Sequence, residues 1–147
     1  MTQNPKFEAR NSKQIFRPEC DHPLGENSKP QKSKTYDLEG RTKEFAKNIR
    51  FFVKQLPKNT SNFEDIKQLV RSSGSVAANY IEANEALSKK DFQHRIKISR
   101  KEAKESILWL ELIDLGDQDE ILKKQQKLID EATQLMKIFS AIMRKTI

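Results

Sequence analysis

Few side chains of this 147-residue chain could act as catalytic groups or metal ligands, and none has a suitable neighbour. The two histidines, His22 and His94, have no second histidine or cysteine at the spacing of a metal site. Cys20, the single cysteine, has no base beside it in the sequence to activate its thiol. Glu82 and Glu85 are better explained as a solvated helix face or as ion-pair partners. We therefore predict no catalytic residues, no metal site and no cofactor, and expect a protein that is not an enzyme.

The chemistry that the sequence offers is positive charge, because 28 lysines and arginines outnumber 21 aspartates and glutamates. Two groups of basic residues at helical spacing are candidate nucleic-acid-binding residues: Lys43, Lys47, Arg50 and Lys54, and Lys97, Arg100, Lys101 and Lys104. Cations held on helices neutralise phosphates without reading the base sequence. The alternative is that these faces only keep the protein in solution. Glu44, Glu102 and Glu105 interrupt the two groups, and we expect no aromatic residue to be interleaved with them as a platform for base stacking.

Four stretches with helical spacing of apolar residues must position these side chains, and no strand pattern occurs. They run over 36–56, over 63–86, from 88 to about 115, and from 117 to near the chain end. Short links between them make consecutive helices antiparallel. The sequence predicts an all-α fold, an antiparallel up-down-up-down four-helix bundle over residues 36–147.

The inward face of each predicted helix consists of residues that mostly step by three or four. In the second helix the face is Ile66, Leu69, Val70, Ser73, Ala77, Tyr80 and Ile81, and in the third it is Phe92, Ile96, Ser99, Ala103, Ser106, Leu110 and Ile113. Small residues surround Gly74, which costs about 1 kcal/mol relative to alanine inside a helix. A glycine kept in a helix at that cost predicts the close approach of another helix. The alternative is a local kink.

Residues 1–35 differ from the rest, because they hold four of the five prolines and few apolar side chains. Such a segment cannot bury enough apolar surface to offset the entropy lost on ordering, so we predict a flexible tail outside the bundle. No stretch approaches the roughly 20 apolar residues that span a bilayer, and no apolar core of a secretory signal is present. With a single cysteine, the expected location is the cytoplasm, without a membrane partner.

The end of the third predicted helix is apolar over more of its circumference than one core face needs. Leu108, Trp109 and Leu112 lie beside the inward positions Leu110 and Ile113. A helix that is apolar on several sides is buried on more than one of them. The pattern predicts an oligomer interface with Trp109 as its anchor, and the alternative is cover by neighbouring helices of the same bundle.

The second and third helices also carry a motif that resembles one protein family. Its matching residues, in order, are Arg71, Ser75, Asn79, Glu82, Ser88, Phe92 and Glu105. The segment resembles the bacterial four-helix-bundle family first noted as proteins encoded in intervening sequences of 23S rRNA genes. That family also includes relatives of the accessory protein of diversity-generating retroelements. The resemblance covers about residues 36–145.

The resemblance implies a homopentamer, and for the retroelement relatives it implies binding to a reverse transcriptase and to nucleic acid. We therefore expect a homo-oligomeric, pentameric scaffold that binds RNA, DNA or a reverse-transcriptase-like protein through its basic helix faces. The alternative is an oligomeric protein-interaction module with no nucleic-acid role, whose tail recruits the partner. Buried polar groups must be paired, so we expect the seven motif residues to have a structural role.

Overall fold

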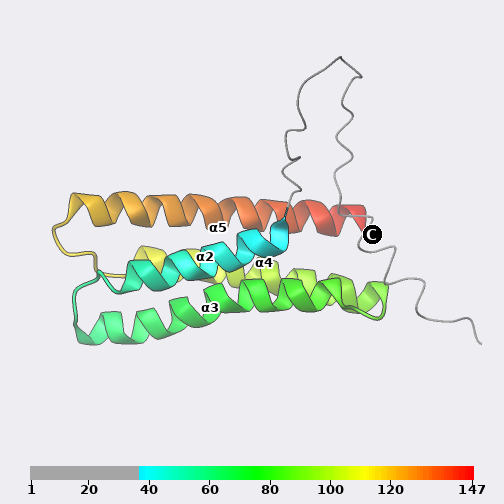
Figure 1. The fold of residues 1–147 in the computed structure, drawn as a ribbon, viewed down its shortest axis with the longest axis horizontal. Helices are drawn as coiled ribbons and strands as arrows, with labels where there is room; N and C mark the ends of the chain where they lie inside the picture. The colour runs from blue at the N-terminus through cyan, green and yellow to red at the C-terminus, as the bar shows by residue number, and fades with distance from the viewer. Residues whose placement is uncertain (1–36) are drawn as a thin grey trace, which may run out of the picture.

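The computed structural model describes residues 37–147, which form four α-helices and no strand. The helices are α2 (Leu38–Val53), α3 (Thr60–Asn84), α4 (Lys89–Leu112) and α5 (Asp119–Lys145). They lie side by side and alternate in direction along the chain (Figure 1). The predicted all-α, antiparallel four-helix bundle is confirmed. The predicted tail, residues 1–35, lies outside the described residues.

The four helices form a closed ring of neighbours. Helix α3 packs against α2 and α4, and α5 packs against α4 and, least closely, α2. Helices α2 and α4 are therefore diagonal to each other, and Figure 1 shows α2 in front with α4 behind it. Helix α2 has only 16 residues against 27 in α5, so it covers only part of the length of α5.

Side-chain caps start three of the helices. Asp37, Asn59 and Ser88 each accept a hydrogen bond from the backbone N–H three residues later, at 2.8, 2.9 and 3.1 Å. The Asn59 cap starts α3 at Thr60, earlier than the apolar spacing predicted. Helix α5 has no such cap and begins at Asp119, two residues after the predicted start.

The core follows the predicted inward faces closely in α4 and less closely in α3. All seven expected positions of α4 are buried. In α3, Ile66, Val70 and Ile81 are only half-buried, while Ser72, Val76 and Ala83 are fully buried. The close contact of α3 with α4 buries Ser72 and Val76 beside the apolar stripe, so the buried face of α3 is wider than the predicted one.

The small residues of α3 permit close packing against α4, as predicted. The Ser72 and Ser106 hydroxyls are 2.9 Å apart, and the Ser99 hydroxyl donates to the Val76 carbonyl at 3.2 Å. Gly74 itself faces α2, because a Cβ there would lie 3.3 Å from a guanidinium nitrogen of Arg50. The missing side chain of Gly74 thus leaves room for Arg50 of α2, a second neighbouring helix.

Candidate nucleic-acid interface

The structure places the two predicted basic groups on opposite sides of the bundle, because α2 and α4 are diagonal. On α2, Lys43, Lys47, Arg50 and Lys54 are all exposed; on α4, Lys97, Lys101 and Lys104 are exposed and Arg100 is half-buried. The two groups therefore cannot form one continuous surface on a single chain.

Three of the four basic residues on α2 are engaged within the chain. The Lys43 ammonium lies 3.2 Å from Glu39 Oε1, and Arg50 Nη1 donates to the Ala46 carbonyl at 2.9 Å. The ammonium of Lys54, which directly follows α2, lies 5.4 Å from the centroid of the Phe51 ring, within cation–π range. The expectation that no aromatic residue is interleaved with this group is therefore wrong. Only Lys47 has no such contact among the described residues, so this group offers less free charge than its sequence indicates.

The outer face of α4 carries a longer basic row than the sequence analysis predicted. Lys90, His94, Lys97, Lys101 and Lys104 step by four, three, four and three, and all five are exposed. We call these five residues the outer stripe. None of them forms an ion pair with another described residue. Lys90 and His94 were not assigned to the basic group, although extending the same regular step toward the start of the helix identifies both of them.

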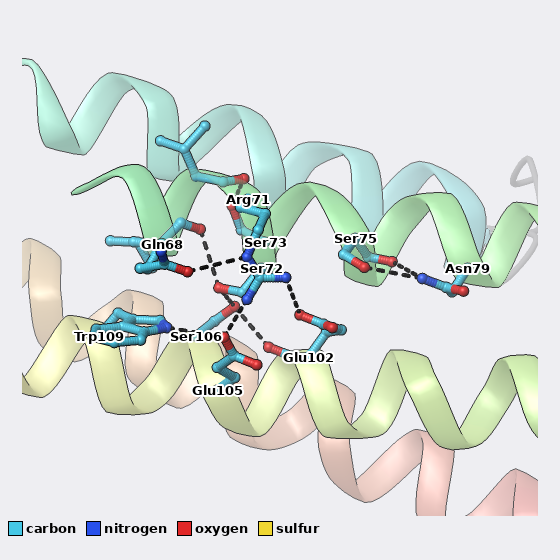
Figure 2. A network of polar contacts seen from close by, with 12 residues as sticks. Gln68, Arg71, Ser72, Ser73, Ser75, Asn79, Glu102, Glu105, Ser106 and Trp109 are labelled. Carbon is cyan, nitrogen blue, oxygen red and sulfur yellow. Dashed lines mark hydrogen bonds and ion pairs between the residues drawn. The ribbon is translucent and has the colours of Figure 1, made fainter. Parts of the chain in front are cut away.

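Two carboxylates expected to interrupt this group point away from it. Glu102 is buried, with a residue exposure of 7%, and Arg71 Nη1 of α3 lies 3.3 Å from its Oε2. Glu105 accepts hydrogen bonds from Arg71 Nη2 and, at 3.2 Å, from Trp109 Nε1 (Figure 2). The expectation that Glu102 and Glu105 interrupt the basic group of α4 is therefore wrong. Arg71 of α3 binds both carboxylates at the contact between α3 and α4, away from the outer stripe (Figure 2).

A second polar cluster joins the same two helices nearer the end of α3. Asn79 Nδ2 donates to the Ser75 carbonyl and hydroxyl, each at 3.0 Å. Arg95 of α4 donates to Asn79 Oδ1 at 3.4 Å and lies 2.5 Å from Glu82 Oε2. Arg95 also lies 3.8 Å from Asp91 of its own helix, but sequence analysis missed its closer partners, Glu82 and Asn79, because they come from α3.

The seven motif residues thus lie at or beside the α3–α4 contact. Ser88 caps α4, and Phe92 is buried in the core with 2% exposure. The buried hydroxyls between the helices are bonded as well, and no buried side-chain polar atom of residues 37–147 lacks a partner. This arrangement stabilises the helix pair that presents the outer stripe.

The three residues predicted as an oligomer interface differ in their exposure. Leu108 and Leu112 are exposed by 47% and 57%. Trp109 is partly buried, packs against the core, and donates its indole N–H to Glu105. The structure therefore places the predicted anchor within the bundle and leaves the two leucines on the surface.

The described residues contain neither a cluster of three or more potential metal ligands nor a helix able to cross a membrane.

Comparison with known proteins identifies a protein family and similar solved structures. The family model described as 23S rRNA-intervening sequence protein matches residues 34–141. The chain is also similar, at 30% identity and a TM-score of 0.63, to the crystal structure of a protein with unknown function from the S23 ribosomal protein family of Bacteroides thetaiotaomicron VPI-5482. That match covers 73% of this chain and 98% of the other. No curated protein matches the chain.

Proposed function

Because this chain belongs to the 23S rRNA-intervening sequence protein family, we propose that it is a non-enzymatic, homo-oligomeric scaffold that binds nucleic acid. Binding would use the basic faces of α4 and α2, and the assembly would be a pentamer in the cytoplasm. A nucleic-acid-handling protein, such as a reverse-transcriptase-like enzyme, would meet the same charged faces.

The observation that carries this proposal is the outer stripe. Its four lysines and one histidine lie in a row on one rigid helix and have no ion-pair partner among residues 37–147. Glu102, the only carboxylate between Lys97 and Lys104, is buried against Arg71. Free ammonium groups on a helix can displace counterions from phosphates, which makes binding strongly dependent on salt.

Replacing Lys97, Lys101 and Lys104 by glutamine should weaken nucleic-acid binding. If all three contact phosphates of a duplex, the slope of log affinity against log salt should fall in magnitude by roughly 2–3. Fluorescence anisotropy with a labelled duplex at several salt concentrations measures both the affinity and the slope. We expect little change in fold, because all three side chains are exposed.

The matched control replaces Lys58, Lys137 and Lys145, which are also exposed and carry no ion pair to another described residue. Equal losses in the two triple variants would mean that net charge, and not the outer stripe, governs binding. If the wild-type protein showed no salt-sensitive binding to RNA or DNA at low ionic strength, the proposal would fail in favour of the protein-interaction module.

Oligomer formation is supported by the two exposed leucines of α4, which follow the outer stripe on the same helix. Replacing Leu108 and Leu112 together by serine should reduce the solution mass from five chains to one, as measured by light scattering during size-exclusion chromatography. The fold should persist, since both side chains are about half exposed or more. We prefer this variant to Trp109→Ala, which would also remove contacts within the bundle.

Leu87 and Leu122 provide the control, because they are exposed by 78% and 53% but lie elsewhere on the chain. Serine at these two positions should leave the mass unchanged. If the wild-type protein had the solution mass of a single chain, the proposal that it is an oligomeric scaffold would be wrong. An unchanged mass in the Leu108 and Leu112 variant would place the interface on another face.

A further inference from the structure

A groove of about 320 Å³ lies between α2 and α5, the least closely packed pair of neighbouring helices. Figure 1 shows these two helices, which are the first and last described elements of the chain, running next to each other. The groove is lined by Asn48, Phe51, Phe52, Gln55, Lys124, Lys127 and Leu128. Phe52 and Leu128 are buried, with 2% and 8% exposure, and form its apolar floor. The volume lies at the small end of ligand sites and suits one compact group.

An exposed aromatic ring lies at this groove. Phe51 keeps 59% of its surface exposed, although a large apolar side chain is normally covered. The Lys54 ammonium lies 5.4 Å from the ring centroid. One face of the ring therefore has a positive charge over it, and the exposed remainder of the ring is open to a planar partner.

The charged side chains that line the groove are of one sign and come from α5. Lys124 and Lys127 of α5 line it, and no carboxylate does. Lys124 Nζ donates at 2.6 Å to Oε1 of Gln55, which lies in the turn after α2, and this bond holds the ammonium across the gap between the helices. Neither Lys124 nor Lys127 forms an ion pair within the part of the chain that the structure describes.

These features together fit a base and its phosphates. Aromatic rings stack with every base, and lysines beside them follow the backbone of a single strand. The side-chain amide of Asn48 at the same groove can donate to and accept from a base edge, whereas Gln55 Nε2 already donates to the Phe51 carbonyl at 3.1 Å. An acidic amphipathic peptide helix would need a row of apolar pockets at helical spacing, whereas this groove has room for one group.

We propose that this groove binds an unpaired base of single-stranded nucleic acid, stacked on Phe51, with the neighbouring phosphates at Lys54, Lys124 and Lys127. The inference rests on the proposed function, and it adds a site and a preference for single strands. A paired base is stacked within its duplex and cannot reach the ring without being unpaired. The outer stripe, on the diagonal helix, contacts phosphates of either form.

Assembly through α4 would leave this groove open. Leu108 and Leu112 lie on the helix diagonal to α2. Each subunit of an oligomer would therefore keep its own α2–α5 groove, and several grooves could bind successive segments of one strand.

The test compares Phe51→Ala with Phe63→Ala, because Phe63 has nearly the same exposure, 58%, but lies on α3 away from the groove. The probes are a labelled thymidine oligonucleotide of about 12 nucleotides and a duplex of the same length, both measured by anisotropy at low salt. Phe51→Ala should weaken single-strand binding by roughly 5- to 100-fold, and duplex binding should change little. Phe63→Ala should bind both probes as the wild type does, and Phe51→Trp should retain single-strand binding.

The possible failures are distinguishable. If Phe51→Ala binds the oligonucleotide as tightly as the wild type, the groove site is overturned and the proposed function stands. If the wild type binds neither probe, the proposed function fails, and the groove site fails with it. Phe51-dependent binding of a glutamate- and leucine-rich peptide, without binding of the oligonucleotide, would overturn the inference in favour of an acidic protein partner.

Discussion

Replacing Phe92 by alanine should lower the free energy of unfolding by about 3–5 kcal/mol, the range for removing a buried phenyl group. The side chain is 2% exposed in the first turn of α4 and belongs to the core cluster. The loss combines the transfer of the phenyl group to water with the cavity left between the helices. Urea denaturation followed by circular dichroism measures it, with all variants at one protein concentration because assembly would add to stability.

Phe51→Ala is the control for this prediction. Its ring is 59% exposed, so its removal should change stability by no more than about 0.5 kcal/mol. The same variant serves the nucleic-acid test, and its stability shows that any loss of binding is not a loss of fold. A cost for Phe92→Ala as small as that for Phe51→Ala would mean that the start of α4 is not part of the cooperative core.

Replacing Arg71 by methionine should cost about 2–3 kcal/mol, because it leaves the buried carboxylate of Glu102 without its cation. A fully buried pair would lose more, but the Arg71 side chain is 48% exposed and water can replace part of its interaction. The substitution also removes the partner of Glu105. Chemical denaturation measures the loss. Arg100→Met on α4 is the control, and it should change the free energy of unfolding by no more than about 0.5 kcal/mol.

A double-mutant cycle separates the ion pair from other effects of the arginine. Glu102→Gln keeps the shape of the side chain but removes its charge, so Arg71→Met should cost less when Glu102 is already glutamine. We expect a coupling energy of about 1–2 kcal/mol. Additive losses would show that the ion pair between Arg71 and Glu102 does not contribute to the free energy of unfolding.

The sequence by itself determined the class of fold and most of the helix pattern. In α4 and its C-cap Ile113, the positions from Phe92 onward that step by three and four are all buried, because residues at this step share one face of a helix. Ser88 also marked the start of its helix correctly, since capping depends on a backbone N–H only three residues away. Such features depend on contacts within a few residues, or on apolar size alone.

The buried face of α3 depended on more than apolar size. Ser72 is buried because α4 approaches closely enough for Ser106 to share a hydrogen bond with it. Val76 is buried at the same contact, and its carbonyl accepts from Ser99. Close contact with a neighbouring helix therefore buries small and polar residues that a single apolar stripe does not predict.

Only the tertiary structure decided which charges and which aromatic ring are available to a ligand. Helical spacing places Glu102 among lysines, but Arg71 of α3 holds its carboxylate inside the bundle and leaves the outer stripe basic. Along the chain Phe51 and Lys124 are far apart, and the packing of the first described helix against the last brings them to one groove. Local periodicity indicates which residues share a face of one helix, whereas these arrangements depend on which helices become neighbours.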